Sequence, residues 1–236
     1  MSSQLSRRTI MTMLGGTVVG HTSAWGHDLR PGDPSYHFQE YEAIVNRSAR
    51  VKQVYEWPNI ANTLIFANIR NSLNGFQFSY DIPADDIQVV VQAYSSATPA
   101  TFDDFIWQKY RWGEALGVRD PQTNEPATRN VFFATPVAYT TLTAGRQPAE
   151  RNHPFFDDTS IEGLQRRRVL FLACHQSTHA LASSANASGR NPDHKSVDEI
   201  VAEFRQHFLP GVIETPAGVG ELVRLQNMGY RLVVNH

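Results

Sequence analysis

The sequence is poor in cysteine, since Cys174 is the only one among 236 residues. A single thiol cannot form an intramolecular disulfide, and it excludes a Cys-x-x-Cys redox pair. In an exported protein, a lone cysteine indicates either pairing with another chain or a free reactive group. Much of the argument about function therefore depends on the residues around Cys174.

The sequence also lacks a large excess of positive or negative charge. The formal net charge is −2, so nothing favours a nucleic-acid partner. Motifs that hold common cofactors are missing too: there is no glycine-rich dinucleotide loop, no phosphate loop and no Gly-x-Ser-x-Gly nucleophile elbow. We therefore expect neither a nucleic-acid partner nor a bound cofactor. The composition, with 41% hydrophobic and 19% charged residues, is that of an ordinary globular protein.

Long hydrophobic runs are absent, and the weakly apolar segment near the N-terminus follows a pair of arginines. Residues 10–20 are too few to span a bilayer, which takes about 20 apolar residues. The order Ser6-Arg7-Arg8-Thr9-Ile10-Met11 instead resembles the twin-arginine (Tat) signal of bacteria. We therefore expect residues 1–26 to be a Tat-type signal peptide. The mature chain is then expected to be periplasmic, with no stable membrane span.

Strand and helix patterns alternate along the first half of the mature chain. Residues 27–50, rich in proline and glycine near their start, are expected to be a linker that leads into the domain. The expected elements then are a strand at 51–57, a helix at 60–76 stopped by Gly75, a strand at 86–95 and a helix at 101–117 capped by Thr101. The near-continuous apolar centre of residues 86–95 is typical of a strand buried in a parallel sheet.

Residues 118–158 lack strong periodicity and are rich in proline, asparagine and threonine. Because so long a loop is unusual in a compact domain, we interpret it as an insertion that either has a function or contains short strands, such as one at 131–142. Beyond it we expect helices at 159–167, 175–188, 196–208 and 218–229, strands at 169–174 and 230–234, and a strand and turn at 212–219. This alternation predicts an α/β fold: a single domain over residues 51–236, with a mainly parallel β-sheet and helices on both faces.

Cys174 follows a buried strand and precedes a helix. In parallel sheets, ligands bind at the carboxyl ends of the strands, where this cysteine is expected to lie. The positive end of the helix dipole favours the thiolate over the thiol, and a protonated His175 beside it would favour the thiolate further. The competing interpretation is a buried structural cysteine, because free cysteine is among the most buried residue types.

His175 and His179 are four residues apart and so share one face of the expected helix. Two such histidines with Cys174 could bind zinc or copper. No acidic partner is obvious nearby, and a single His-x-x-x-His is a weak signal. Solvated or hydrogen-bonded histidines are the simpler interpretation, and we predict no metal site.

Three segments of the chain resemble one family. They are "DFIWQKYRWGEALGVRDPQTNEPATRN", "RRRVLFLACHQSTHALA" and "FLPGVIETPAGVGELVRLQNMGYRLVV", and they are similar to exported, Tat-signal members of the DsrE/DsrF-like superfamily. The similarity runs from about Val51 to Val234. The resemblance implies one α/β domain, assembly into homo-oligomers, and a cysteine at the position of Cys174 that carries sulfur as a persulfide and passes it to a partner.

This resemblance leads to a functional hypothesis with alternatives. The chain is expected to be an exported DsrE-like protein that binds or transfers sulfane sulfur through Cys174, with His175 as the second catalytic residue. Ser95, Ser96 and His179 are the expected ligand-binding residues. One alternative is a non-catalytic, periplasmic ligand-binding or assembly module of the same fold, and another is a Cys/His metal protein. Whether the chain is an enzyme stays open, and its expected partners are copies of itself and a sulfur donor, sulfur acceptor or small-molecule ligand.

Overall fold

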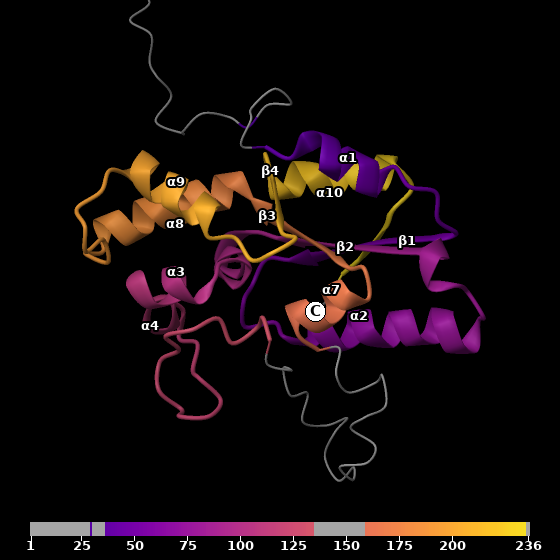
Figure 1. The fold of residues 1–236 in the computed structure, drawn as a ribbon, viewed down its shortest axis with the longest axis horizontal. Coiled ribbons are helices and arrows are strands. Elements are labelled where there is room, and N and C mark those ends of the chain that lie inside the picture. Colours follow the sequence, from indigo (N-terminus) through magenta and orange to yellow (C-terminus); the bar gives the residue numbers. More distant parts are fainter. Residues whose placement is uncertain (1–28, 30–35, 135–158, 235–236) are drawn as a thin grey trace, which may run out of the picture.

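A five-stranded parallel β-sheet is the centre of the molecule in the computed structural model, which describes residue 29 and residues 36–134 and 159–234 (Figure 1). The strand order is β4-β3-β2-β1-β5, and every pair of neighbours is parallel. The strands are β1 (Val51–Trp57), β2 (Ile87–Ala93), β3 (Leu170–Cys174), β4 (Ile213–Thr215) and β5 (Arg231–Val233). The predicted α/β fold with a parallel sheet is confirmed.

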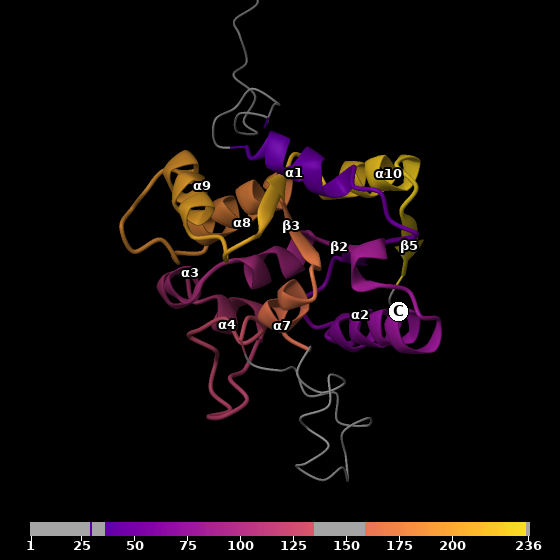
Figure 2. The same ribbon diagram turned by 45° about the vertical axis from the view of Figure 1, so that its right-hand side comes forward.

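Helices cover both faces of this sheet (Figures 1 and 2). Helices α1 (Phe38–Val45) and α10 (Gly218–Asn227) lie on one face, and α2 (Leu64–Asn74) and α7 (Ile161–Arg166) lie on the other. The remaining α-helices of the described residues, grouped at the left of Figure 1, are α3 (Asp104–Lys109), α4 (Trp112–Leu116), α8 (His175–Ala187) and α9 (Val197–Gln206). None of the described helices is both long and apolar enough to span a membrane.

Strand β2 explains why both faces need a cover, because all seven of its residues are buried. Side chains alternate along a strand, so Val89 and Val91 pack in the larger core with α2 while Val90 packs in the smaller core with α1 and α10. By the same alternation, two buried glutamines, Gln88 and Gln92, share the face of Val90. Buried amides need hydrogen-bond partners. Gln88 lies near the start of β2 and Gln92 near its end, so a buried amide must find partners at each end of the strand.

The interpretation of residues 27–50 as a linker is wrong for its later part. Residues 38–45 form α1, whose Tyr41 and Val45 are fully buried against the smaller core. Proline and glycine before residue 35 suggested a linker, but the apolar spacing of Tyr41 and Val45, four residues apart, marks a helix face. The domain therefore includes this helix, and residues 1–26, the expected signal peptide, lie outside the described residues.

The expected single helix at 101–117 is two helices, α3 and α4. Asp103, not Thr101, caps α3, because its carboxylate accepts a hydrogen bond from the Ile106 amide at 3.2 Å. The break falls at Arg111, which has a left-handed backbone with φ of 49°. The break lets Trp112 fold back into the core, where its side chain is nearly fully buried.

Two other expectations need correction. Gly75 does not stop the helical segment, because α2 is followed by a wider π-helical turn from Gly75 to Ser79. Residues 131–134 form a turn and not the start of a strand, because the Asn130 side chain accepts a hydrogen bond from the Phe132 amide at 2.9 Å. The rest of the expected insertion, residues 135–158, lies outside the described residues.

Candidate functional site

Cys174 is both the last residue of β3 and the N-cap of α8. Its sulfur accepts a hydrogen bond from the Ser177 amide at 3.4 Å, the role that serine or aspartate usually has at a helix start. The side chain is only 4% exposed. The residue is therefore at the carboxyl edge of the sheet, but just beneath the surface and not on it.

A second helix also points its N-terminus at the same sulfur. The backbone N–H of Gly218, the first residue of α10, donates to the Sγ atom of Cys174 at 3.1 Å. Two helices, α8 directly after the cysteine and α10 about forty residues further along the chain, thus each present an N–H and a positive dipole end to one sulfur atom. Such an arrangement stabilises a negative charge on the sulfur.

Gly218 can reach the sulfur because it has no side chain. A Cβ atom at this position would lie 2.9 Å from the Cβ of Tyr94 and 3.3 Å from the Cβ of Cys174. Contacts as short as the first do not occur between real side chains, so any larger residue would displace the start of α10. The sequence analysis missed Gly218; its signal was the Ala217-Gly218-Val219-Gly220 segment at the start of a helix.

His175, the predicted second catalytic residue, is part of a buried charged group. Its Nδ1 atom lies 3.1 Å from Oε1 of Glu214, and the other carboxylate oxygen lies 2.7 Å from Nε of Arg205. Glu214 is the middle residue of β4 and pairs in register with Ala173 of β3, which places it beside the start of α8. The carboxylate orients the imidazole ring immediately after the cysteine in the chain.

The structure separates the two predicted ligand-binding serines. The Ser95 amide donates to Oγ of Ser177 at 2.8 Å, which ties the end of β2 to the first turn of α8. Ser95 has a left-handed backbone with φ of 54°. The Ser96 hydroxyl instead donates to the Pro58 carbonyl and accepts from the Ile60 amide, both of which follow β1. Only Ser95 therefore lies beside the turn that holds Cys174.

His179 lies one turn further along α8 and is buried. Its Nε2 atom is 4.0 Å from Oδ1 of Asp198 in α9, so the ring lies between helices α8 and α9. Within the part of the chain that the structure describes, no group of three or more His, Cys, Asp or Glu residues could hold a metal ion. Cys174, His175 and His179 thus do not form the ligand set that their spacing allows.

Tyr94, at the end of β2, is a further residue of this site that the sequence analysis missed. Its hydroxyl donates to Oε2 of Glu56 at 3.0 Å. Burial, then the hydrogen bond and the charge of Glu56, and finally the charge of Cys174 raise the pKa of Tyr94 to about 12. Tyr94 is thus a neutral phenol at physiological pH.

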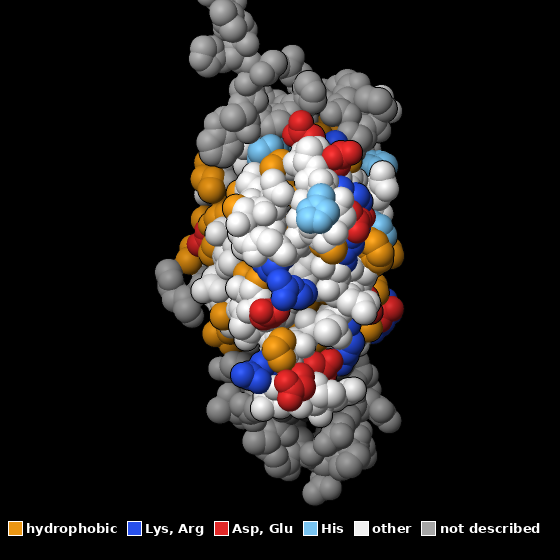
Figure 3. All heavy atoms as spheres, turned by 90° about the vertical axis from the view of Figure 1, so that its left-hand side faces the viewer, with side chains coloured by type: hydrophobic (Ala, Val, Ile, Leu, Met, Phe, Trp, Pro, Cys, Tyr) orange, Lys and Arg blue, Asp and Glu red, His pale blue; other side chains and the backbone are white. Residues whose placement is uncertain are grey.

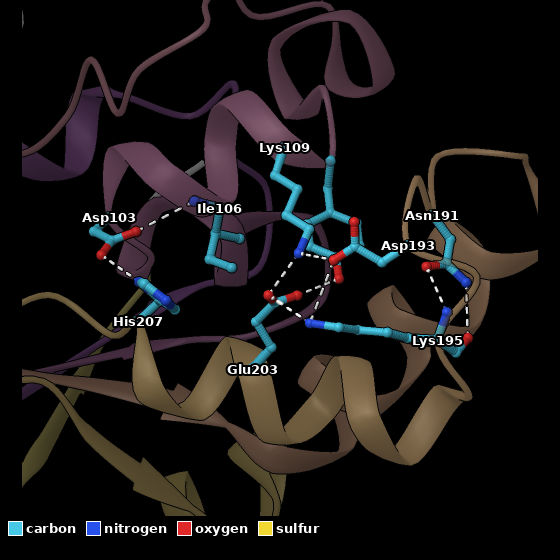
Figure 4. Close-up of polar contacts among 9 residues, drawn as sticks. Asp103, Ile106, Lys109, Asn191, Asp193, Lys195, Glu203 and His207 are labelled. Carbon is cyan, nitrogen blue, oxygen red and sulfur yellow. Dashed lines mark hydrogen bonds and ion pairs between the residues drawn. The ribbon is translucent and has the colours of Figure 1, made fainter.

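A polar network ties α9, which carries Arg205, to α3 (Figure 4). Glu203 accepts hydrogen bonds from Lys109 at 2.6 Å, Lys195 at 2.7 Å and Tyr110 at 2.5 Å. At the other end of the interface, Nδ1 of His207 lies 2.7 Å from Oδ2 of Asp103. These contacts hold α9 against the body of the protein and so fix the helix from which Arg205 reaches Glu214.

The outer surface on this side carries no excess of either charge. Figure 3 shows acidic and basic side chains interspersed, with hydrophobic side chains in small groups. No single-sign patch of the kind that binds nucleic acid covers this face.

Comparison with known proteins yields no assignment. No protein-family model matches the chain, and no curated protein matches it.

Proposed function

We propose that this chain is an exported, DsrE-like protein that carries sulfane sulfur on Cys174. The observation that supports this most is the pair of backbone N–H groups, from Ser177 and Gly218, that donate to one sulfur atom. Two helix N-termini directed at a thiol favour the thiolate, which is the nucleophilic form of cysteine. A persulfide anion on the same residue would benefit from the same dipoles.

The proposed step is a thiolate–sulfur exchange. The Cys174 thiolate attacks the outer sulfur of a persulfide R–S–SH, a new S–S bond forms on Cys174, and the bond to R–S breaks so that RS⁻ leaves. The products are the cysteine persulfide and a thiolate, so atoms, charge and electrons balance without a further oxidant. Attack by an acceptor thiolate on the same outer sulfur reverses the loading and passes the sulfur on.

His175 has a role near this sulfur that its contacts support. The Glu214 carboxylate keeps one ring nitrogen engaged, and Arg205 holds that carboxylate in turn. An imidazole ring held in this way can exchange a proton with an incoming thiol. We assign His175 as the residue that assists Cys174, with Glu214 and Arg205 as positioning residues.

Access to the sulfur is the constraint on this proposal. Cys174 is buried, but three residues next to it or to its hydrogen-bond partners are exposed: Ser95, Gln176 and Ala217. The sulfur therefore lies one side chain below the surface, at the junction of three strand ends. A small donor such as inorganic polysulfide needs only a minor opening there, whereas a bulky donor needs the start of α10 to move.

The decisive experiment loads the folded protein with sulfur. The full chain is incubated with inorganic polysulfide, and its intact mass is recorded beside that of Cys174→Ser. We expect an adduct of about 32 Da, one sulfur atom, on the wild type and none on the variant, because the thiolate is the acceptor. If the adduct forms only after unfolding in urea, Cys174 is a structural cap and the proposal is refuted.

Export and assembly belong to the proposal as well, on the support of the Tat-like N-terminus and the family resemblance. Fractionation of a bacterial host should place the full chain in the periplasm, and Arg7→Lys with Arg8→Lys should retain it in the cytoplasm. Sedimentation should give a homo-oligomer. A cytoplasmic wild type would refute export, and a monomer would refute assembly.

The burial of Cys174 favours one other candidate, a non-catalytic ligand-binding or assembly module. In that case the sulfur only accepts the hydrogen bonds from the backbone amides at the starts of α8 and α10. Cys174→Ser would then keep the fold, the assembly and any ligand, because a serine oxygen is a good N-cap acceptor.

A further inference from the structure

A cavity of about 620 Å³ lies at the opposite edge of the sheet from Cys174. It is formed where β2 and β3 begin, between the end of α1 and the turn that follows α7, and Pro210 and Gly211 close one side. Because Leu170 starts β3 and Cys174 ends it, the length of the strand separates the cavity from the cysteine. The volume is in the range that holds small organic molecules.

Gln88 is a buried polar residue in this cavity with an unused acceptor. Its side chain is 3% exposed, and its Nε2 atom donates to the carbonyl of Ile44 in α1. Its Oε1 atom has no hydrogen-bond partner among the residues that the structure describes. Gln92, on the same face of the same strand, differs: its amide nitrogen donates to the Ala93 carbonyl at 3.0 Å, and its oxygen accepts from Thr215 at 3.1 Å.

An unsatisfied amide oxygen in a buried site costs free energy, so its presence in a cavity indicates a missing partner. That partner must be a donor, since the oxygen can only accept. The wall around it is largely apolar, with Ile44, Leu170 and Pro210 among its residues. A ligand with an apolar body and one hydroxyl or amino group would fill the space and satisfy Gln88.

Two arginines line the rim of the cavity. Arg47 makes one long hydrogen bond, 3.5 Å, to the Ile87 carbonyl and forms no ion pair with any residue in the described ranges. Arg168 pairs with Asp85, and both side chains are more than half exposed, at 54% and 75%. So exposed a pair is weak and can exchange its carboxylate for that of a ligand. Guanidinium groups bind carboxylate and phosphate through paired N–H donors.

We propose that this cavity binds a small organic anion, a carboxylate or a phosphate monoester, that also carries a hydroxyl or amino donor. The anionic group is bound by Arg47 and Arg168, and the donor by Oε1 of Gln88, a lining residue whose oxygen is buried in the structure without a ligand. This site is separate from the sulfur chemistry, because it includes neither Cys174 nor the carboxyl edge of the sheet.

Four probes of similar size test this by equilibrium dialysis against the full chain. They are 3-hydroxybenzoate, 3-hydroxyphenyl phosphate, uncharged 3-hydroxybenzamide, and benzoate, which lacks the donor. We expect at least one hydroxylated anion to bind about tenfold more tightly than the amide, and 3-hydroxybenzoate to bind more tightly than benzoate. Tighter binding of 3-hydroxybenzoate identifies the ligand as a carboxylate, and tighter binding of 3-hydroxyphenyl phosphate identifies it as a phosphate monoester.

Variants assign the binding to the cavity. Arg47→Gln should weaken binding of the anions about tenfold, and Gln88→Leu should abolish the preference for the hydroxyl group. Arg231 is an exposed arginine on β5. Arg231→Gln and Cys174→Ser should change neither the affinity for the anions nor the preference for the hydroxyl group. The proposal is overturned if no anionic probe binds at about 10 mM, or if Arg47→Gln binds like Arg231→Gln. Arg47 is exposed, so that comparison remains valid even if Gln88→Leu does not fold.

Discussion

Gly218→Ala is the substitution that tests the cysteine site most directly. The new Cβ atom would lie 2.9 Å from the Cβ of Tyr94 and 3.3 Å from that of Cys174, with the Gln92 amide nitrogen also at 3.3 Å. Since two of these neighbours are Cβ atoms bonded directly to the backbone, they cannot rotate away. The first turn of α10 must shift, and the 3.1 Å hydrogen bond from the Gly218 amide to the sulfur lengthens or breaks.

The expected cost has two parts. Overpacking of this kind destabilises by about 1–3 kcal/mol, partly offset because alanine loses less backbone entropy than glycine, by up to about 1 kcal/mol. A net loss of about 1–2 kcal/mol corresponds to a fall in Tm of about 2–8 °C for a chain of this length. Loss of one hydrogen bond to a charged sulfur, worth about 1.5 kcal/mol, lowers the population of the thiolate about tenfold.

The assay separates the reactivity of the thiol from its accessibility. The rate of alkylation by iodoacetamide is measured at about pH 7 and about pH 10, because the thiolate is the form that reacts. The ratio of the rate at the lower pH to the rate at the higher pH is then compared between variants. A more open site raises both rates and leaves the ratio unchanged. We expect the ratio to fall about tenfold in Gly218→Ala.

Gly220→Ala is the matched control. A Cβ atom at Gly220 would meet only the Cβ of Ala217, at 3.8 Å, which is an ordinary contact. This variant should keep the ratio and should be as stable as the wild type or slightly more so. An unchanged ratio in Gly218→Ala, together with a lower Tm, would show that the second helix does not stabilise the thiolate.

Two predictions concern the charges that hold α9. Burial alone would raise the pKa of Glu203, but hydrogen bonds from Lys109, Lys195 and Tyr110 outweigh it and lower the pKa to about 2, from 4.5. The stabilisation is complete above about pH 4.5 and is lost as the pH falls toward 2; it is at most on the order of 3 kcal/mol. Urea unfolding should therefore show Glu203→Gln well below the wild type at pH 7 and the two converging near pH 2; a constant difference would contradict the reasoning. Arg205→Ala leaves the Glu214 carboxylate buried with one fewer cation and should cost about 3 kcal/mol. Arg166→Ala removes an exposed i,i+4 partner of Glu162 and should cost less than about 0.5 kcal/mol; equal losses in the two variants would refute the assignment of Glu214 as a buried, paired carboxylate.

Local signals predicted much of the sheet and of the helices near the cysteine. The expected strand at 51–57 is β1, and the expected helix at 175–188 differs from α8 by one residue. The capping box of Ser196 and Glu199 is present, with both of its hydrogen bonds. These elements could be read from sequence because alternation, helical spacing and caps involve residues only two to four positions apart.

Other elements depended on contacts that no local pattern contains. Helix α1 is stabilised by burial against Val54 and Val90, which lie further along the chain, so its short apolar pattern alone was a weak signal. The break at Arg111 follows from the packing of Trp112, and a helix propensity cannot show it. The separation of Ser95 from Ser96 depends on which neighbour each side chain reaches after the strand ends.

The sequence by itself determined that the protein is α/β, that one cysteine ends a buried strand, and that a helix begins at that cysteine. Only the tertiary structure decided what surrounds the sulfur, because Gly218 and Glu214 come from a segment about forty residues further along the chain. The pairing of β4 with β3 brings that segment to the cysteine. The hollow that Gln88 lines, and the unused acceptor of this residue, likewise exist only once α1 and the start of β3 are in place. Strand register and helix packing set these distances, and both are properties of the whole fold.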